Sequence, residues 1–282
     1  MMLRSGAGAG YAVKNKIAQS IVFVVLALGG IGSGCATVEQ TGAYQHRTSD
    51  ILSGYPQSRD PLKLQRITST PISIDPASTG NGEVFIIVHP AYSAFFRDPA
   101  KDRYSEAKDL MVRKQFDNET SAITAQAASG KLVVLVLPGK YAEDSHSPLS
   151  YISYLNSLMA DGRQLYYVLS DTSSAGSLPM NDMVSLYSFI TVNKAKKVMI
   201  GGGYIGRCQR EFYNQLTTYL DKSFAYVVPE MSVVSPDDVS EEEALTIASS
   251  VTMHDFSPVR AFIDKKTGGK ANILSIPPKQ DL

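Results

Sequence analysis

The sequence of 282 residues has no tryptophan, two cysteines and four histidines, and no long run of lysine and arginine. Two cysteines are too few for a disulfide framework or a four-cysteine zinc site. Asp144 and His146 could each bind a metal, but two scattered ligands fall short of a zinc signature and favour a solvated loop. The lack of a basic cluster argues against a nucleic-acid-binding surface. We therefore expect neither a metal nor nucleic acid.

No apolar stretch reaches the roughly 20 residues that a membrane-spanning helix needs. The longest one, residues 17–31, follows a segment with three basic residues and no acidic residue, and small residues at 32–34 come next. A basic start, a short apolar run and a small-residue cleavage site define a secretory signal. We therefore expect residues 1–34 to be a signal peptide.

The residues before Cys35 resemble the lipobox of bacterial lipoproteins, although Ile31 lies one place earlier than the usual aliphatic residue and Gly32 takes its position. This resemblance implies that Cys35 carries lipid, and Ala36 after it implies sorting to the outer membrane, facing the periplasm. The alternatives are a cleaved soluble protein and an uncleaved anchor. If Cys35 is acylated, Cys208 has no disulfide partner.

Residues 35–82 are polar and contain four prolines and a closing Gly-Asn-Gly. They show no sustained periodicity, so we interpret them as a tether between the lipid and a folded domain. The alternative is that residues 67–74 pair with the domain as an edge strand. The tether interpretation places the start of the main domain at residue 83.

Residues 83–282 alternate short apolar runs with longer segments of helical pattern. The runs are 84–88, 132–137, 165–169, 197–200 and 224–228, with a possible sixth at 271–276, and the helical segments are 104–128, 148–160, 180–193, 205–220 and 241–251. Apolar strands without alternation are typical of a parallel sheet covered on both faces. The pattern predicts a doubly wound α/β domain with a mostly parallel sheet of five to six strands and helices on both faces.

In such sheets, ligands bind at the carboxyl ends of the strands, near the point where the strand order reverses. His89 ends the first predicted strand, Asp171 the third and Glu230 the fifth, while Cys208 lies just past the fourth. Residues 143, 144 and 146 follow the second strand. We expect these polar side chains to lie along one edge of the sheet.

Gly201, Gly203 and Gly206 match the G-x-G-x-x-G pattern between a strand and a helix. The stretch resembles the second nucleotide-binding motif of pyridine-nucleotide disulfide reductases, and the resemblance implies that Glu230 would bind the ribose. The alternative is that the glycines serve a tight strand-to-helix turn.

Residues 198–236 resemble the cysteine-bearing region of isochorismatase-like hydrolases, and residues 85–96 resemble the first strand of that family. The resemblance implies that Cys208 is a nucleophile at a helix start, where its thiol pKa would be lowered. His89 replaces the family's catalytic aspartate, and Ser-Asp-Thr at 170–172 stands where its lysine would be. A Cys208–His89–Asp171 arrangement is chemically conceivable. Alternatively, Cys208 belongs to a buried helical stripe with Phe212.

The leading hypothesis is a lipid-anchored envelope protein whose α/β domain binds a small molecule or an envelope protein partner without catalysis and without a cofactor. The first alternative is a Cys208-dependent hydrolase of the isochorismatase-like type. The second is a dinucleotide-binding domain.

Overall fold

The computed structural model describes residues 51–70, 72–74, 82–97, 104–159 and 163–276. The predicted signal peptide and the predicted lipid site Cys35 lie outside the described residues. Within the described ranges, no helix is long and apolar enough to cross a membrane.

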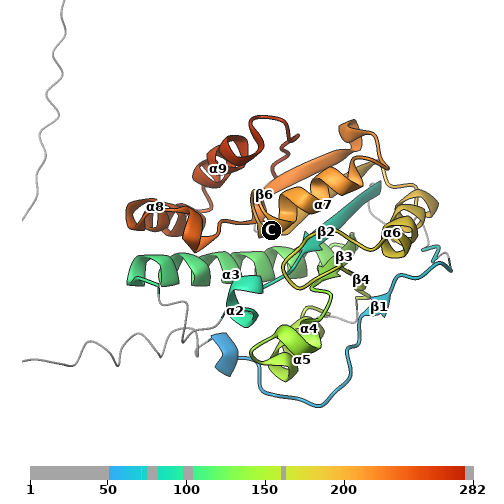
Figure 1. Ribbon diagram of the computed structural model, residues 1–282, viewed down its shortest axis with the longest axis horizontal. Coiled ribbons are helices and arrows are strands. Elements are labelled where there is room, and N and C mark those ends of the chain that lie inside the picture. The colour runs from blue at the N-terminus through green and yellow to red at the C-terminus, as the bar shows by residue number, and fades with distance from the viewer. Residues whose placement is uncertain (1–50, 71, 75–81, 98–103, 160–162, 277–282) are drawn as a thin grey trace, which may run out of the picture. The chain divides into compact units, whose positions relative to one another are not determined.

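Six parallel strands form one sheet in the order β1-β4-β3-β2-β5-β6 (Figure 1). The strands are β1 (Gln65–Arg66), β2 (Glu83–Val88), β3 (Leu132–Leu137), β4 (Tyr166–Leu169), β5 (Lys197–Tyr204) and β6 (Ala225–Val233). The predicted α/β fold class with a parallel sheet is confirmed. β5 and β6 continue beyond the predicted runs, so Glu230 lies inside β6 and not at its end.

The strand order reverses at β2. The chain runs from β2 outward to β3 and β4 on one side, then crosses to β5 and β6 on the other. β2 pairs in register with both β3 and β5, from Val84 to Val88. The carboxyl ends of β2 and β5 therefore form the switch point at which doubly wound sheets bind ligands.

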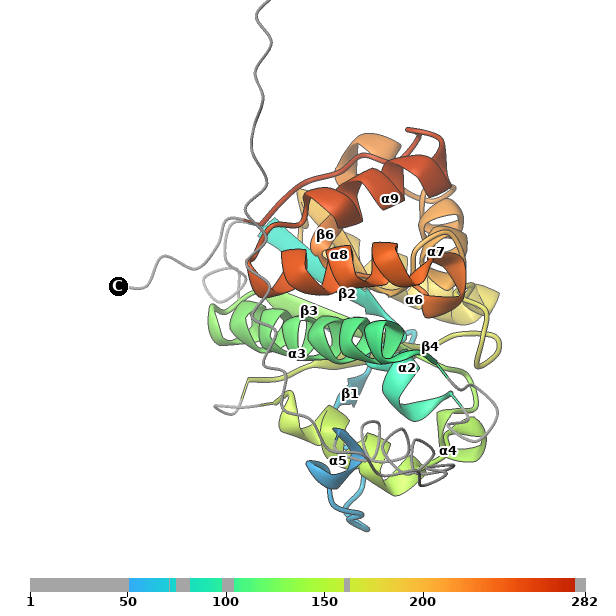
Figure 2. The same ribbon diagram turned by 90° about the vertical axis from the view of Figure 1, so that its left-hand side faces the viewer.

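Helices cover both faces of the sheet, which explains why β3 and residues 84–88 of β2 are apolar at every position. The helices are α2 (Tyr92–Phe95), α3 (Glu106–Ala128), α4 (Tyr141–Asp144), α5 (Pro148–Ser157), α6 (Met180–Val192), α7 (Cys208–Leu216), α8 (Glu241–Thr252) and α9 (Ser257–Thr267). Val84, Ile86 and Val88 of β2 pack in a core cluster with α6 and α7. Phe85 and Ile87 face the opposite way, toward α3 and α5. α8 lies alongside α3 (Figure 2), and the capping box of Ser240 and Glu243 starts it.

The packed part of the chain begins before the boundary predicted at residue 83. Ile67 is 1% exposed and joins the core, and the main chain of residues 65–67 pairs with β4 as an edge strand. Ile51 and Leu64 are also buried. Backbone pairing at a sheet edge needs no hydrophobic periodicity, so a polar segment with a few well-placed apolar residues docks here. At the other edge, residues 271–276 make an isolated parallel bridge, Val227 with Ile273, rather than a strand.

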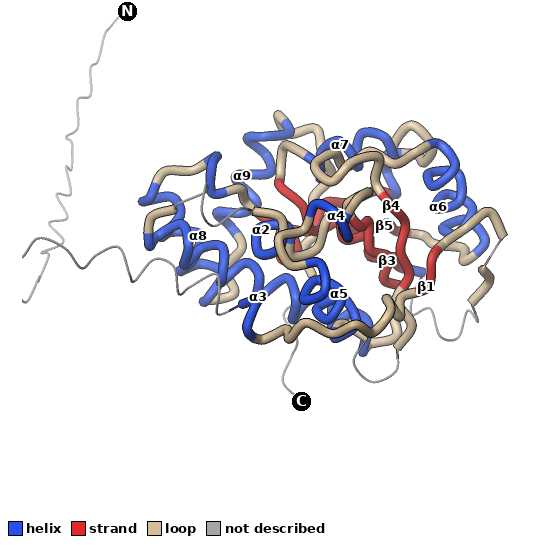
Figure 3. Tube along the Cα trace, turned by 60° about the horizontal axis from the view of Figure 1, so that its bottom comes forward, coloured by secondary structure: helices blue, strands red, loops and turns tan. Residues whose placement is uncertain are grey.

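The short helices α2 and α4 follow β2 and β3 directly and lie near the carboxyl edge of the sheet (Figure 3). A long loop leads from β4 to α6 at the same edge. Its Gly176 N–H donates to Glu211 Oε2 at 3.0 Å, and Leu178 exchanges two hydrogen bonds with Gln215. The loop is therefore attached to α7 and covers the start of that helix.

Candidate functional site

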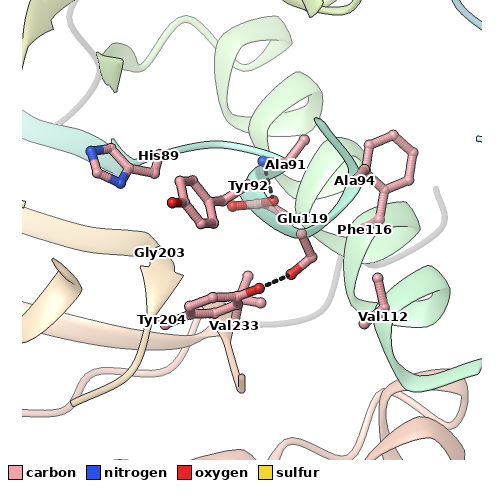
Figure 4. Close-up of a pocket in the computed structure, with 11 residues that line it drawn as sticks. His89, Ala91, Tyr92, Ala94, Val112, Phe116, Glu119, Gly203, Tyr204 and Val233 are labelled. Atoms are coloured by element: carbon pink, nitrogen blue, oxygen red, sulfur yellow. Dashed lines mark hydrogen bonds between the residues drawn. The ribbon is translucent and has the colours of Figure 1, made fainter. Parts of the chain in front are cut away.

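A cavity of about 10 Å³ lies at the switch point, between the ends of β2 and β5 and the helices α2 and α3. That volume holds about one water molecule. Figure 4 shows the side chains around it: His89 on one side, Glu119 of α3 on the other, and the rings of Tyr92 and Tyr204 between them. The structure thus has a small cavity at the edge of the sheet where the sequence predicted polar side chains, and His89 and Glu119 are among the residues that line it.

His89 turns into the protein because the backbone after β2 is left-handed. Its φ is 46°, and that of Ala91 is 56°. Such values strain residues other than glycine, and histidine is among those that tolerate them better. The ring is 1% exposed, and burial lowers its pKa to about 3. His89 is therefore a neutral imidazole at physiological pH.

The hydrogen bonds around Ser170 determine which nitrogen of His89 carries the proton. Ser170 Oγ donates to the carbonyl oxygen of Thr172 at 2.6 Å. Its only hydrogen is then used, so Ser170 must accept the bond that joins it to His89 Nε2 at 3.0 Å. Nε2 carries the proton, and Nδ1 is a bare acceptor, buried and without a hydrogen-bond partner among the described residues.

Cys208 is the first residue of α7, and its Sγ accepts a hydrogen bond from the Tyr204 N–H at 3.1 Å. The thiol is 3% exposed. Burial raises its pKa to about 11, and the bonds from the backbone N–H groups of Tyr204 and Gln209 offset part of that rise. The expectation of a lowered thiol pKa is wrong, because desolvation outweighs the helix start.

Gly203 separates Cys208 from the end of β2. A β-carbon on Gly203 would lie 3.0 Å from Cys208 Sγ and 3.3 Å from the Val88 side chain, and His89 follows Val88 in the chain. Tyr92 stacks on the His89 ring at 5.5 Å, and its hydroxyl is close enough to Cys208 for the two to interact electrostatically. Among the described residues, no hydrogen bond joins Cys208 Sγ to His89 directly. The two side chains nevertheless share one neighbourhood.

Asp171 does not take part in this arrangement. Its side chain is exposed, and its N–H donates to the carbonyl oxygen of Ser177. The preceding residue, Ser170, is buried and holds His89 instead, because neighbouring side chains in extended chain point to opposite sides. Serine is common where a strand passes into a loop. The sequence therefore contained no signal that favoured Ser170 over Asp171 as the partner of His89.

Glu119 is a site residue that the sequence did not reveal. It lies in the middle of α3, where a glutamate ordinarily faces water. Here it is 2% exposed, and Oε2 accepts from the Ala91 N–H at 3.0 Å. Oε1 has no partner within the described structure, and burial raises the pKa of the carboxyl to about 8. Glu119 is therefore protonated at neutral pH, and its proton lies on Oε1.

The glycines of the G-x-G-x-x-G pattern are accounted for by packing. A β-carbon on Gly201 would lie 2.5 Å from that of Met231, and Gly206, with a φ of 81°, lies against the Lys266 side chain. Gly201 and Gly203 belong to β5 itself. A phosphate group needs an open helix start, but a β-carbon on Gly176 would lie 1.8 Å from the Cys208 carbonyl oxygen.

Glu230, the predicted ribose ligand, interacts with the C-terminal segment. Burial raises the pKa of its carboxyl, and hydrogen bonds from Ile276 and Ser275 act in the opposite direction. The structure thus offers no further support for a dinucleotide site.

Glu143 and Asp144 lie in α4 and not in the expected loop, His146 follows that helix, and all three are exposed. Asp144 accepts a hydrogen bond from the Ser173 hydroxyl. Among the residues that the structure describes, no three histidines, cysteines or acidic residues lie close enough together to hold a metal ion.

No protein-family model matches the chain, and no curated relative does. Several solved structures are similar to it. The YcaC gene product of Escherichia coli, an octameric hydrolase of unknown specificity, is 12% identical, with a TM-score of 0.41 over 74% of this chain and 80% of its own. A pyrazinamidase of Pyrococcus horikoshii in complex with zinc is 16% identical, with a TM-score of 0.35 over 60% and 96%. A cysteine hydrolase from Pseudomonas syringae is 12% identical, with a TM-score of 0.34 over 75% and 100%. Similarity at this level does not extend to activity or to individual residues.

Proposed function

We propose that the domain is a cysteine-dependent hydrolase in which Cys208 is the nucleophile, His89 the general base and Ser170 the residue that orients the base. The observation that carries this proposal is the bare Nδ1 of His89, which has no partner among the described residues while Ser170 holds Nε2. Gly203 lines the same cavity as His89 and lies against Cys208 Sγ. A nucleophile, a base and a third group that orients the base are the parts of a catalytic triad. Catalytic hydrogen bonds are often long without substrate and tighten when it binds.

The proposed reaction is acyl transfer to sulfur followed by hydrolysis. The Cys208 proton moves to His89 Nδ1 while Sγ attacks the carbonyl carbon of the substrate. The imidazolium then returns the proton to the leaving group, and a thioester remains. Water, deprotonated by the same Nδ1, hydrolyses the thioester and restores the thiol. The Tyr204 N–H, now bonded to Sγ, is positioned to stabilise the oxyanion.

The two pKa values describe how the proton must move. The thiol pKa is about 11 and that of His89 about 3, so the proton stays on sulfur in the resting protein. Transfer therefore has to occur together with carbon–sulfur bond formation. Glu119 lines the cavity, and its neutral carboxyl can donate a hydrogen bond to a carbonyl oxygen, as neutral carboxyl groups do in other enzymes.

The test is acylation of the protein with p-nitrophenyl acetate, followed by mass spectrometry of the intact chain. We expect acetylation at Cys208 and turnover that Cys208→Ala abolishes. His89→Asn should lower the rate by about 100-fold or more, the usual contribution of a general base. His254→Asn is the matched control, because His254 also has a left-handed backbone, at φ 54°, but is exposed. Acetylation elsewhere, or an unchanged rate in Cys208→Ala, would contradict the proposal.

The second candidate function is ligand binding without catalysis. It is favoured by the burial of the Cys208 thiol, which is 3% exposed, and by the raised pKa that burial gives it. A protein of this kind would show no acylation of Cys208 at any pH. It would still be stabilised against heat by small amides, and Glu119→Gln would weaken that stabilisation.

We also propose that the chain is exported and anchored through acylated Cys35, so that the domain works at the outer membrane facing the periplasm. The support is the lipobox-like segment and the signal-like start of the sequence. Mass spectrometry of the mature protein should find acyl groups on Cys35, and Cys35→Ser should release or misprocess the protein. An unmodified N-terminus downstream of residue 35 would contradict the anchor.

A further inference from the structure

A second, larger cavity of about 400 Å³ opens between α7, α9 and β6, away from the cavity at His89. The three elements lie next to one another in Figure 1. Four basic residues line this cavity: Arg210, Lys222, Lys266 and Lys270. We propose that the cleft binds the phosphate group of a small phosphorylated molecule.

The cleft is strongly basic. Among the described residues, no acidic side chain lines it, although the chain as a whole has equal numbers of acidic and basic residues. Lys266 is paired with Asp238 at 3.4 Å, which leaves three cations for a ligand. The end of α9 contributes about half a negative charge at the same place, too little to cancel them. An anion of charge near −2, such as a phosphate monoester, therefore matches the cleft.

The α7 side of the cleft has the geometry for directed hydrogen bonds. Arg210, Asn214 and Thr217 are four and three residues apart, so they lie on one face of the helix. A guanidinium group binds two phosphate oxygens at once, which gives Arg210 the central role. Gly206 has no side chain and lets the Lys266 stem pack against the backbone, at 3.1 Å from where a β-carbon would be.

The size and shape of the cleft indicate which phosphates fit. A cavity of about 400 Å³ lies in the range of small-molecule sites. Nucleic acid would need a basic stripe or face along which several phosphates bind. The cations here meet in one pocket, so a single phosphate group with a small organic body is the expected ligand.

The experiment is isothermal titration calorimetry of the full chain with glucose 6-phosphate, and with glucose as the uncharged control. We expect glucose 6-phosphate to bind and glucose not to bind, and we expect added salt to weaken the binding of glucose 6-phosphate. Arg210→Gln and Lys270→Gln should each reduce the affinity by about tenfold, the usual effect of losing one charge-assisted hydrogen bond. Arg260→Gln, an exposed arginine on α9 that does not line the cleft, is the matched control and should bind normally.

A second arm separates free phosphates from lipid headgroups. The full chain with Cys35→Ser is mixed with phosphatidylglycerol vesicles and with phosphatidylcholine vesicles. Binding of glucose 6-phosphate without vesicle binding supports the proposal, whereas binding to phosphatidylglycerol vesicles alone overturns it in favour of a membrane surface. No binding of either, or binding unchanged in Arg210→Gln, also overturns it. Cys208→Ala should bind glucose 6-phosphate normally, so this proposal stands or fails separately from the hydrolase.

Discussion

At the scale of single residues, His89 combines a strained backbone with a neutral buried ring. Its folded pKa, about 3, lies below the ordinary value of 6.5, so between these pH values the unfolded chain binds a proton that the folded chain does not. The free energy of unfolding should therefore fall as the pH drops from about 6.5 to about 3, by a few kcal/mol for a shift of this size.

The substitution His89→Asn should flatten this acid-side dependence, because asparagine does not titrate and tolerates the left-handed backbone. Urea denaturation at several pH values between 3 and 7 measures it. His254→Asn, at the exposed left-handed histidine, should leave the slope as it is. Equal slopes in the wild type and His89→Asn would show that His89 does not stay neutral in the fold.

Glu119 makes the free energy of unfolding depend on pH in the opposite direction. Its folded pKa of about 8 lies above the ordinary 4.5, so the unfolded chain loses its proton first as the pH rises. The free energy of unfolding should decrease from about pH 4.5 to about pH 8 and then level off. Glu119→Gln should be more stable than the wild type at pH 9 and close to it at pH 5, as thermal melts can measure. Glu242→Gln, exposed on α8, should show no such difference, and a wild-type pattern in Glu119→Gln would contradict the buried neutral carboxyl.

At the scale of elements, the loop between β4 and α6 determines access to the start of α7. A β-carbon on Gly176 would lie 1.8 Å from the Cys208 carbonyl oxygen, so Gly176→Ala forces the loop away from the helix. We expect faster alkylation of Cys208 by iodoacetamide in Gly176→Ala, and a lower melting temperature. Ser174→Ala, at an exposed position of the same loop, should react as slowly as the wild type. An unchanged alkylation rate in Gly176→Ala would mean that the loop does not protect the thiol.

The arrangement of strands also explains why the G-x-G-x-x-G pattern is present without a phosphate-binding turn. The sequence contains the spacing that a phosphate-binding turn requires, yet β5 runs through Gly201 and Gly203 and pairs with β2 and β6 on either side. A spacing pattern indicates that small residues are needed at these positions, but it does not indicate the reason. Here the neighbours Met231, Cys208 and Lys266 supply the reason.

At the scale of the whole molecule, the folded domain is longer than the sequence pattern indicated. A chain that starts at residue 51 should keep the stability of the full chain, whereas one that starts at residue 75 loses β1 and the buried side chains of Ile51, Leu64 and Ile67. Burial of each such side chain contributes about 1.5–3 kcal/mol. Urea denaturation of the two truncated chains tests this, and equal midpoints would show that residues 51–74 are a tether after all.

The large-scale prediction succeeded because it rested on local patterns. Apolar runs without alternation indicated strands buried on both faces, and the helical segments between them required parallel crossovers. The rule for open sheets then placed His89 and Cys208 at one edge, where the structure has them. The capping box of Ser240 and Glu243 is equally local, because it joins residues that are three apart in the chain.

What the sequence by itself determined is therefore the α/β class, the strand direction and the edge that carries the polar residues, because each follows from contacts between near neighbours in the chain. The tertiary structure decided which groups meet there. It joined His89 to Ser170 rather than Asp171, brought Glu119 from the middle of α3, and gathered four cations from separate segments into one cleft. These pairings depend on strand register and loop paths, which are set by packing across the whole domain and leave no periodicity in the sequence.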